Sequence, residues 1–109
     1  MPEAMEVHIT APDATQAADM ARTLVEEGLC ACVNIVSGVR SIYVYEGKLC
    51  DDPEVLCIAK TRPELFDRLQ RRIRELHPYE IPEILAFAVD EGSAEYLDWL
   101  RQSTTSAGP

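Results

Sequence analysis

The sequence predicts an α+β fold in which two helices cover one face of a single antiparallel sheet. Residues 5–10 alternate between apolar and polar side chains, as a half-buried strand does. Residues 17–25 and 65–76 repeat apolar side chains at helical spacing. Residues 55–59 and 84–89 are short, continuous apolar runs, which are typical of strands buried on both faces. Strands and helices alternate along the chain, and this pattern sets the fold class.

The first strand and the first helix have clear boundary signals. In the strand, Val7 and Ile9 share one face. Asp13 follows a proline and can accept hydrogen bonds from the free amides of a first helical turn, with Gln16 reaching back toward it. Gly28 ends this helix, because glycine adopts the left-handed conformation without steric cost.

Residues 31–45 predict a strand far longer than the usual length of about five or six residues. Ser37-Gly38 divides it and predicts a bulge or bend. Two polar stretches, 46–48 and 51–53, mark a loop that leads into a strand over residues 54–60. The two strands form a hairpin.

The second half of the chain repeats the pattern. Pro63 opens a helix at a position where its missing amide is harmless, and His77-Pro78 ends that helix because the residue before a proline disfavours the α region. Residues 81–89 predict the last strand, with Pro82 at its start or at a sheet edge. A short helix follows, over about residues 93–100.

This order of elements predicts the ferredoxin-like βαββαβ arrangement, with a short C-terminal helix added. A chain of 109 residues has room for one hydrophobic core. We therefore expect a single domain over residues 1–109, with a core from about 5 to 102. The small, polar tail at 103–109 is expected to be frayed.

The composition excludes several functions. The formal net charge of −9 disfavours nucleic acid, whose binding depends on Lys and Arg displacing counterions. No apolar run approaches the roughly 20 residues that a membrane span needs, so we expect no membrane association. The N-terminus lacks the basic and apolar regions of a secretory signal, which predicts a cytoplasmic protein.

Five arginines lie within one short segment and could form a local basic patch. They are Arg62, Arg68, Arg71, Arg72 and Arg74. Glu64 and Asp67, however, precede two of them by four residues, the favourable order for ion pairs along a helix. This spacing favours a solvated helix face over a binding patch.

The apolar strands predict self-association. Both crossovers between parallel strands should be right-handed, which places both main helices on one face of the sheet. The other face should then be polar, yet residues 55–59 and 84–89 are continuously apolar. The C-terminal helix is too short to cover that face, so a second copy of the chain is expected there.

The densest polar cluster is the segment His77-Pro78-Tyr79-Glu80-Ile81-Pro82-Glu83. An imidazole, a phenol and carboxylates so close together could bind a metal or an anion, or transfer protons. In the alternative interpretation, His77 only interacts with the helix end and has no role in folding. Lys60 ends an apolar strand and needs a partner there, for which Glu83 is the natural candidate.

The four cysteines, Cys30, Cys32, Cys50 and Cys57, are expected to be thiols because the predicted compartment is reducing. Cys30 and Cys32 at strand spacing would share a face, so a metal pair is geometrically possible. The four-ligand spacing of a zinc site is absent, which favours small buried hydrophobes. His8, alone on its strand, predicts a core or interface histidine.

Taken in order, several motifs resemble the CutA divalent-cation tolerance family over nearly the whole chain. They are Thr10-Ala11-Pro12, Ala31-Cys32-Val33-Asn34, Ser41-Ile42-Tyr43, Glu46-Gly47-Lys48, Glu54 with Lys60-Thr61, His77-Pro78-Tyr79, Pro82-Glu83 and Tyr96-Leu97-x-Trp99. The resemblance implies a ferredoxin-like homotrimer with a role in tolerance to divalent ions such as copper.

The resemblance also implies a ligand-binding cleft between subunits. Its residues would be Tyr45, Lys60, His77, Tyr79 and Glu83, with His77 and Cys32 as candidate ligands for a divalent metal. Tyr45 stands where the family often has tryptophan. Ile9 and Leu76 replace a cysteine and a histidine of the copper site proposed for some members, so His77 alone remains of that site.

Together these observations predict a non-enzymatic homotrimer that takes part in metal-ion tolerance. Two alternatives stay open. One is a purely structural or signalling assembly module without a metal. The other is a small acylphosphatase-like hydrolase, which shares the topology but needs an anion-cradling loop with an arginine near the first strand, and this chain has no such loop.

Overall fold

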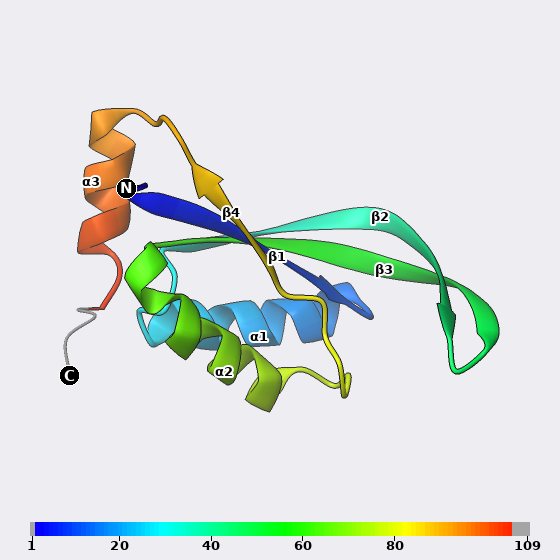
Figure 1. The fold of residues 1–109 in the computed structure, drawn as a ribbon. Coiled ribbons are helices and arrows are strands. Elements are labelled where there is room, and N and C mark those ends of the chain that lie inside the picture. Colours follow the sequence, from blue (N-terminus) through cyan, green and yellow to red (C-terminus); the bar gives the residue numbers. More distant parts are fainter. Residues whose placement is uncertain (1, 106–109) are drawn as a thin grey trace.

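The computed structural model describes residues 2–105 and contains one four-stranded, fully antiparallel sheet in the order β2-β3-β1-β4. The strands are β1 (Ala4–Ala11), β2 (Cys32–Tyr45), β3 (Lys48–Thr61) and β4 (Leu85–Val89). The helices are α1 (Ala14–Glu26), the 3₁₀ turn η1 (Pro63–Leu65), α2 (Phe66–Leu76) and α3 (Ala94–Gln102). Figure 1 shows α1 and α2 side by side on one face of the sheet. The predicted α+β class and the predicted order of strands and helices along the chain are confirmed.

Local sequence signals place the helix ends. Asp13 caps α1, and its Oδ1 accepts a 2.8 Å hydrogen bond from the Gln16 amide. Ser93 caps α3 in the same way, accepting from the Tyr96 amide. Gly28, with φ of +72°, follows α1 as predicted.

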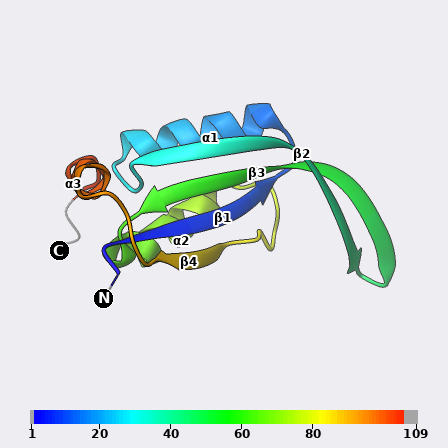
Figure 2. The ribbon, with the colours of Figure 1, turned by 90° about the horizontal axis from the view of Figure 1, so that it is seen from above.

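The hairpin of β2 and β3 extends well beyond the helices as a two-stranded arm (Figures 1 and 2). Each strand has 14 residues. The register shifts between Val36 and Val39, so that Ser37 and Gly38 lie opposite a single residue of β3. This is the predicted bulge, and Gly38 has the positive φ that it requires.

The turn at the tip of the arm is shorter than the sequence suggests. β3 begins at Lys48 instead of residue 54, so only Glu46 and Gly47 connect the strands. Their φ values of 50° and 79° are both positive, as in a type I′ turn. The polar residues expected to form a loop are instead paired in the strand. Their low strand propensity is overridden by cross-strand contacts.

The main core lies between the sheet and the two long helices. Val7 and Ile9 of β1, Cys57 of β3, and Leu69 and Ile73 of α2 are all fully buried in it. A second, smaller cluster lies at the other end of the sheet, where Leu100 of α3 packs with Ala4 and Ala31. α3 thus covers only one end of the sheet (Figure 2).

Two predicted boundaries are wrong. The last strand begins at Leu85, not at residue 81, because Pro78 and Pro82 cannot donate to a ladder and residues 77–84 stay irregular. The tail is ordered through Thr105, whose amide donates a 2.7 Å bond to the Gly28 carbonyl. Residues 106–109 of the predicted tail lie outside the described residues.

The face of the sheet opposite α1 and α2 is largely uncovered. Register places Glu6 beside Lys60 and Phe87, and His8 beside Ile58 and Leu85, all on this open face. Phe87 is 48% exposed, and its ring packs against His8 with 4.5 Å between ring centroids. An apolar face of this kind is what the sequence predicts for an interface.

Candidate ligand-binding site

His77 lies directly after α2 and is held by the end of β1. Its side chain is only 7% exposed. Nε2 lies 2.7 Å from the Thr10 carbonyl oxygen, and Nδ1 accepts a 3.1 Å bond from the Tyr79 amide. These contacts assign the neutral tautomer with the proton on Nε2, since that nitrogen must donate while Nδ1 accepts.

This geometry corrects the expectation that His77 has no role in folding. The imidazole is buried and bridges the loop after α2 to β1, so it is part of the folded framework. A metal could bind at Nδ1 only after the Tyr79 amide has moved away, because that nitrogen's one lone pair is already used.

Tyr79 extends the same cluster toward β3. Its hydroxyl donates a 2.8 Å hydrogen bond to the Glu54 carboxylate, and its ring lies 4.8 Å from that of His77. The pKa of Tyr79 is raised to about 12, first by desolvation and then by the hydrogen bond and charge of Glu54, with Asp52 and Asp13 adding smaller effects. The phenol is therefore a proton donor to a carboxylate at neutral pH.

Lys60 lies elsewhere, on the open face near the end of β3. It is level with Glu6 of β1 and Cys32 of β2, and its ammonium donates to the Asn34 side chain. His77 contacts Thr10, four residues farther along β1 than Glu6, which is a backbone separation of about 13 Å.

The expected Lys60–Glu83 pair does not form within one chain. No ion pair joins these two residues in the part of the chain that the structure describes, and Glu83 is exposed in the irregular segment before β4. Asn34 replaces it as the partner of Lys60, because both project onto the open face from neighbouring strands.

Tyr45 is the most distant of the predicted cleft residues. It is the last residue of β2, at the tip of the arm, and is exposed. Of the five predicted cleft residues, a single chain thus brings only His77 and Tyr79 into contact. Lys60, Glu83 and Tyr45 lie at three other places.

Thr10, Asn34 and Glu54 also belong to these groups. All three occur in the family motifs given above, although they are not among the predicted site residues. Two of them, Asn34 and Glu54, were visible as polar side chains within or next to apolar strands. Thr10 acts through its backbone carbonyl, for which no residue type gives a signal.

The cysteines do not form the metal pair that strand spacing allows. Cys30 precedes β2 and is buried in the main core, whereas Cys32 lies on the open face beside Lys60. Burial raises the pKa of the Cys30 thiol to about 12. All four cysteines are free thiols, and residues 2–105 contain no group of three or more His, Cys, Asp or Glu side chains that could hold a metal.

The fold and these polar groups define a class: a small α+β protein with one open sheet face, a long β-arm and polar side chains distributed around both. Residues 5–103 match the family model of the CutA1 divalent ion tolerance protein. The chain belongs to this family.

Individual relatives agree over most of the chain. The divalent-cation tolerance protein CutA of Thermus thermophilus is 49% identical over 98 residues, covering 90% of this chain and 95% of the relative. The human protein CutA is 42% identical, but the chain spans only 55% of its length.

Solved structures agree as well. The Thermus thermophilus protein superposes with a TM-score of 0.90 at 47% identity, covering 94% of this chain and 99% of the other. CutA1 from Oryza sativa gives 0.92 at 38% identity, covering 95% of each.

The names of relatives give more than one location. A relative from Arabidopsis thaliana is named chloroplastic, and one from Archaeoglobus fulgidus periplasmic. In the described residues of this chain, no helix is long and apolar enough to cross a membrane.

Proposed function

We propose that this chain forms a cytoplasmic homotrimer that contributes to tolerance of divalent metal ions, copper in particular, without catalysing a reaction. Family membership supports the link to divalent ions, because the family model and the relatives are named for that tolerance. A role in binding is favoured over catalysis because the family and the relatives are named for tolerance of divalent ions and not for a reaction.

One observation carries the proposed cleft: Tyr45 and Lys60 lie too far from His77 to meet it within one subunit. Lys60 and His77 lie at opposite ends of β1, and Tyr45 lies at the tip of an arm that extends beyond the core. The open apolar face gives a second copy a place to pack. Packing there, with the arm reaching a neighbour, would let Tyr45 and Lys60 of one subunit approach His77, Tyr79 and Glu83 of another.

For the metal, we propose Cys32 as the primary ligand and His77 as a second ligand from a neighbouring subunit. Cys32 is partly exposed on the open face, and thiolates bind copper and zinc well. His77 can join only when its bond to the Tyr79 amide opens, at a cost of about 1–3 kcal/mol. Metal affinity is therefore expected to be modest.

The test combines assembly and complementation. Light scattering should give a mass of three subunits at micromolar concentration. Two variants, Lys60→Ala and Tyr79→Ala, would each lose ligand binding in the pure trimer. Trimers refolded from a mixture of the two would recover part of it, because a cleft between subunits can combine the intact half of each variant.

Equilibrium dialysis with Cu²⁺ and Zn²⁺ tests the metal. Cys32→Ser should abolish binding, and His77→Ala should weaken it. A stable monomer, or metal binding that survives Cys32→Ser, would contradict the proposal.

A structural assembly module is the second candidate. The observation that favours it is the use of both His77 ring nitrogens within the chain. It predicts a trimer that binds neither metal, with His77→Ala affecting stability alone. The hydrolase alternative gains no support, since the turn after β1 carries no arginine.

A further inference from the structure

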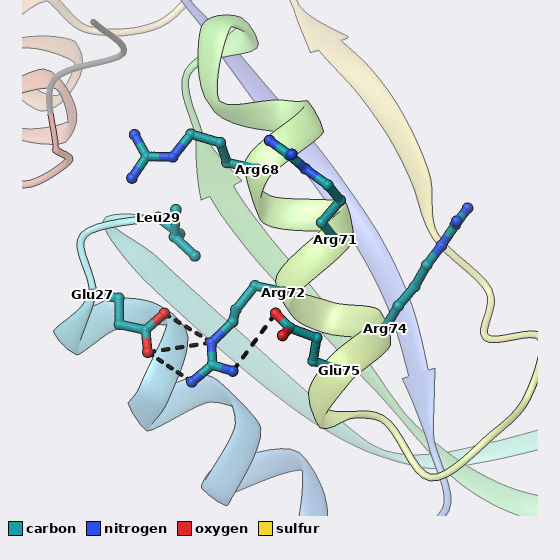
Figure 3. Close-up of a pocket in the computed structure, with 7 residues that line it drawn as sticks. All are labelled: Glu27, Leu29, Arg68, Arg71, Arg72, Arg74 and Glu75. Atoms are coloured by element: carbon teal, nitrogen blue, oxygen red, sulfur yellow. Dashed lines mark hydrogen bonds and ion pairs between the residues drawn. The ribbon is translucent and has the colours of Figure 1, made fainter. Parts of the chain in front are cut away.

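A groove lies between the end of α1 and the outer surface of α2, away from the cluster of His77, Tyr79 and Glu54. Its volume is about 570 Å³, within the range of small-molecule sites. Four arginines line it, and they are Arg68, Arg71, Arg72 and Arg74. Figure 3 shows all four projecting from α2.

Two glutamates partly neutralise the groove. Glu27, after α1, accepts bonds of 2.9 and 2.8 Å from Arg72 Nε and Nη2, which hold the pKa of that carboxyl below its usual value. Glu75 lies 3.7 Å from Arg72 on its other side. Both glutamates thus act on the same arginine, as Figure 3 shows.

Among the described residues, the two glutamates leave Arg71 and Arg74 without a neutralising carboxylate. Arg71 donates from Nε to the Asp67 backbone carbonyl at 3.2 Å, not to the predicted carboxylate. Within residues 2–105, no ion pair joins Arg71 or Arg74 to a carboxylate. The lining residues carry two more positive charges than negative ones, in a chain whose total charge is −9.

This arrangement works against the helix that carries it. Arg68 and Arg72 are four residues apart, and Arg71 follows Arg68 by three, so like charges are neighbours along one side of α2. Such like-charged pairs destabilise a helix. A local conflict of this kind is expected where a sequence serves binding instead of folding.

We propose that this groove binds a compact, multiply charged phosphate compound. Guanidinium groups match the geometry of phosphate oxygens, and a polyvalent anion would relieve the repulsion between neighbouring arginines. The ligand is expected to be compact because the rest of the chain is strongly negative. A long polyanion such as nucleic acid, or an anionic bilayer, would extend beyond the groove into a strongly negative surface and be repelled.

The test uses inorganic pyrophosphate as the probe, titrated calorimetrically into the full, metal-free chain at low salt. Replacing Arg68 and Arg71 together by Gln should weaken binding at least about tenfold, as expected for losing two charge-assisted bonds. Glu75→Gln should tighten it, because it removes a competing carboxylate. The matched control is Arg22→Gln on α1, an exposed arginine paired with Asp19 outside the groove, and it should leave affinity within about twofold.

Three results would overturn the proposal. They are no binding at millimolar pyrophosphate, equal weakening by Arg22→Gln and the double variant, or tighter binding to phosphatidylserine vesicles or single-stranded DNA than to pyrophosphate. None of these outcomes depends on the metal site or on the cleft between subunits.

Discussion

At the scale of single residues, two polar side chains join parts of the chain that are far apart. His77 contacts a backbone carbonyl 67 positions earlier, and Tyr79 reaches a carboxylate 25 positions earlier. Their partners hold residues 77–84, which lack secondary structure, against the sheet. Removing either side chain should therefore lower the stability of the fold as well as weaken binding.

His77→Ala is expected to destabilise the protein by about 2–3 kcal/mol. It removes a buried ring and leaves the Thr10 carbonyl and the Tyr79 amide without their partner. Urea unfolding at fixed protein concentration measures this, with Glu80→Ala in the same exposed segment as control, expected within about 0.5 kcal/mol. A loss as small as the control's would mean that water replaces the ring.

Tyr79 should make the protein sensitive to alkali. Its pKa in the folded protein is raised to about 12, above the unfolded value of about 10. The stability it contributes is therefore complete below about pH 10 and is lost as the pH rises through about 12. Wild-type protein should lose stability more steeply than Tyr79→Phe across this interval.

Urea midpoints measured against pH test this prediction. Glu54→Gln removes the carboxylate that accepts the phenol proton and should move the loss of stability to lower pH. Parallel curves for wild type and Tyr79→Phe would show that the phenol ionises in the folded protein as it does in the unfolded chain.

At the scale of elements, three glycines permit turns that other residues resist. Gly38 forms the bulge, Gly47 the tip of the arm, and Gly28 the turn after α1. Gly28 also lies against the C-terminal segment. A Cβ there would come within 3.0 Å of the Thr105 amide nitrogen, whereas one at Gly47 would meet nothing within 4 Å.

Gly28→Ala and Gly47→Ala form a matched pair. Both force alanine into the left-handed region, at a cost of about 1–2 kcal/mol. Gly28→Ala should cost about 1–3 kcal/mol more, because it also displaces the backbone of Thr105. Unfolding free energies of the two variants give the difference directly, and equal values would show that the C-terminal segment moves aside freely.

The elements were largely predictable from local sequence signals, and their boundaries were not. Asp13, Gly28 and Ser37-Gly38 act on their own neighbours, so their roles could be read without a structure. The start of β4 and the ordered C-terminal segment depend on contacts between distant segments, which leave no periodic pattern. The site divides in the same way: His77 and Tyr79 stand out by type, but their partners do not.

At the scale of the whole molecule, two apolar side chains near β4 lie in different surroundings, so charging them should have different effects. Phe87 lies on the open sheet face, next to His8. Ile84, from the same apolar run, packs against the main core. Charging Ile84 should therefore unfold the subunit, whereas charging Phe87 should act on association.

Phe87→Lys should reduce assembly while leaving the subunit folded. A charge placed in the proposed interface would lose its hydration when copies associate. Sedimentation velocity at micromolar concentration should show a smaller species, and circular dichroism an unchanged spectrum. The control is Val25→Lys on α1, where a side chain of similar exposure lies away from the open face. An unchanged mass for Phe87→Lys would place the interface elsewhere.

The arm described above also has a consequence for how the protein matures. β2 is an edge strand of 14 residues, with Ile42, Val44 and Tyr45 exposed along its outer half. An uncovered edge of this length pairs with any extended chain that it meets, whether or not that chain is the right one. For a newly made subunit, correct association therefore competes with aggregation, since the rates of both rise with subunit concentration. Refolding yield should be highest at an intermediate concentration, where the edge is covered quickly yet few unfolded chains remain to capture it.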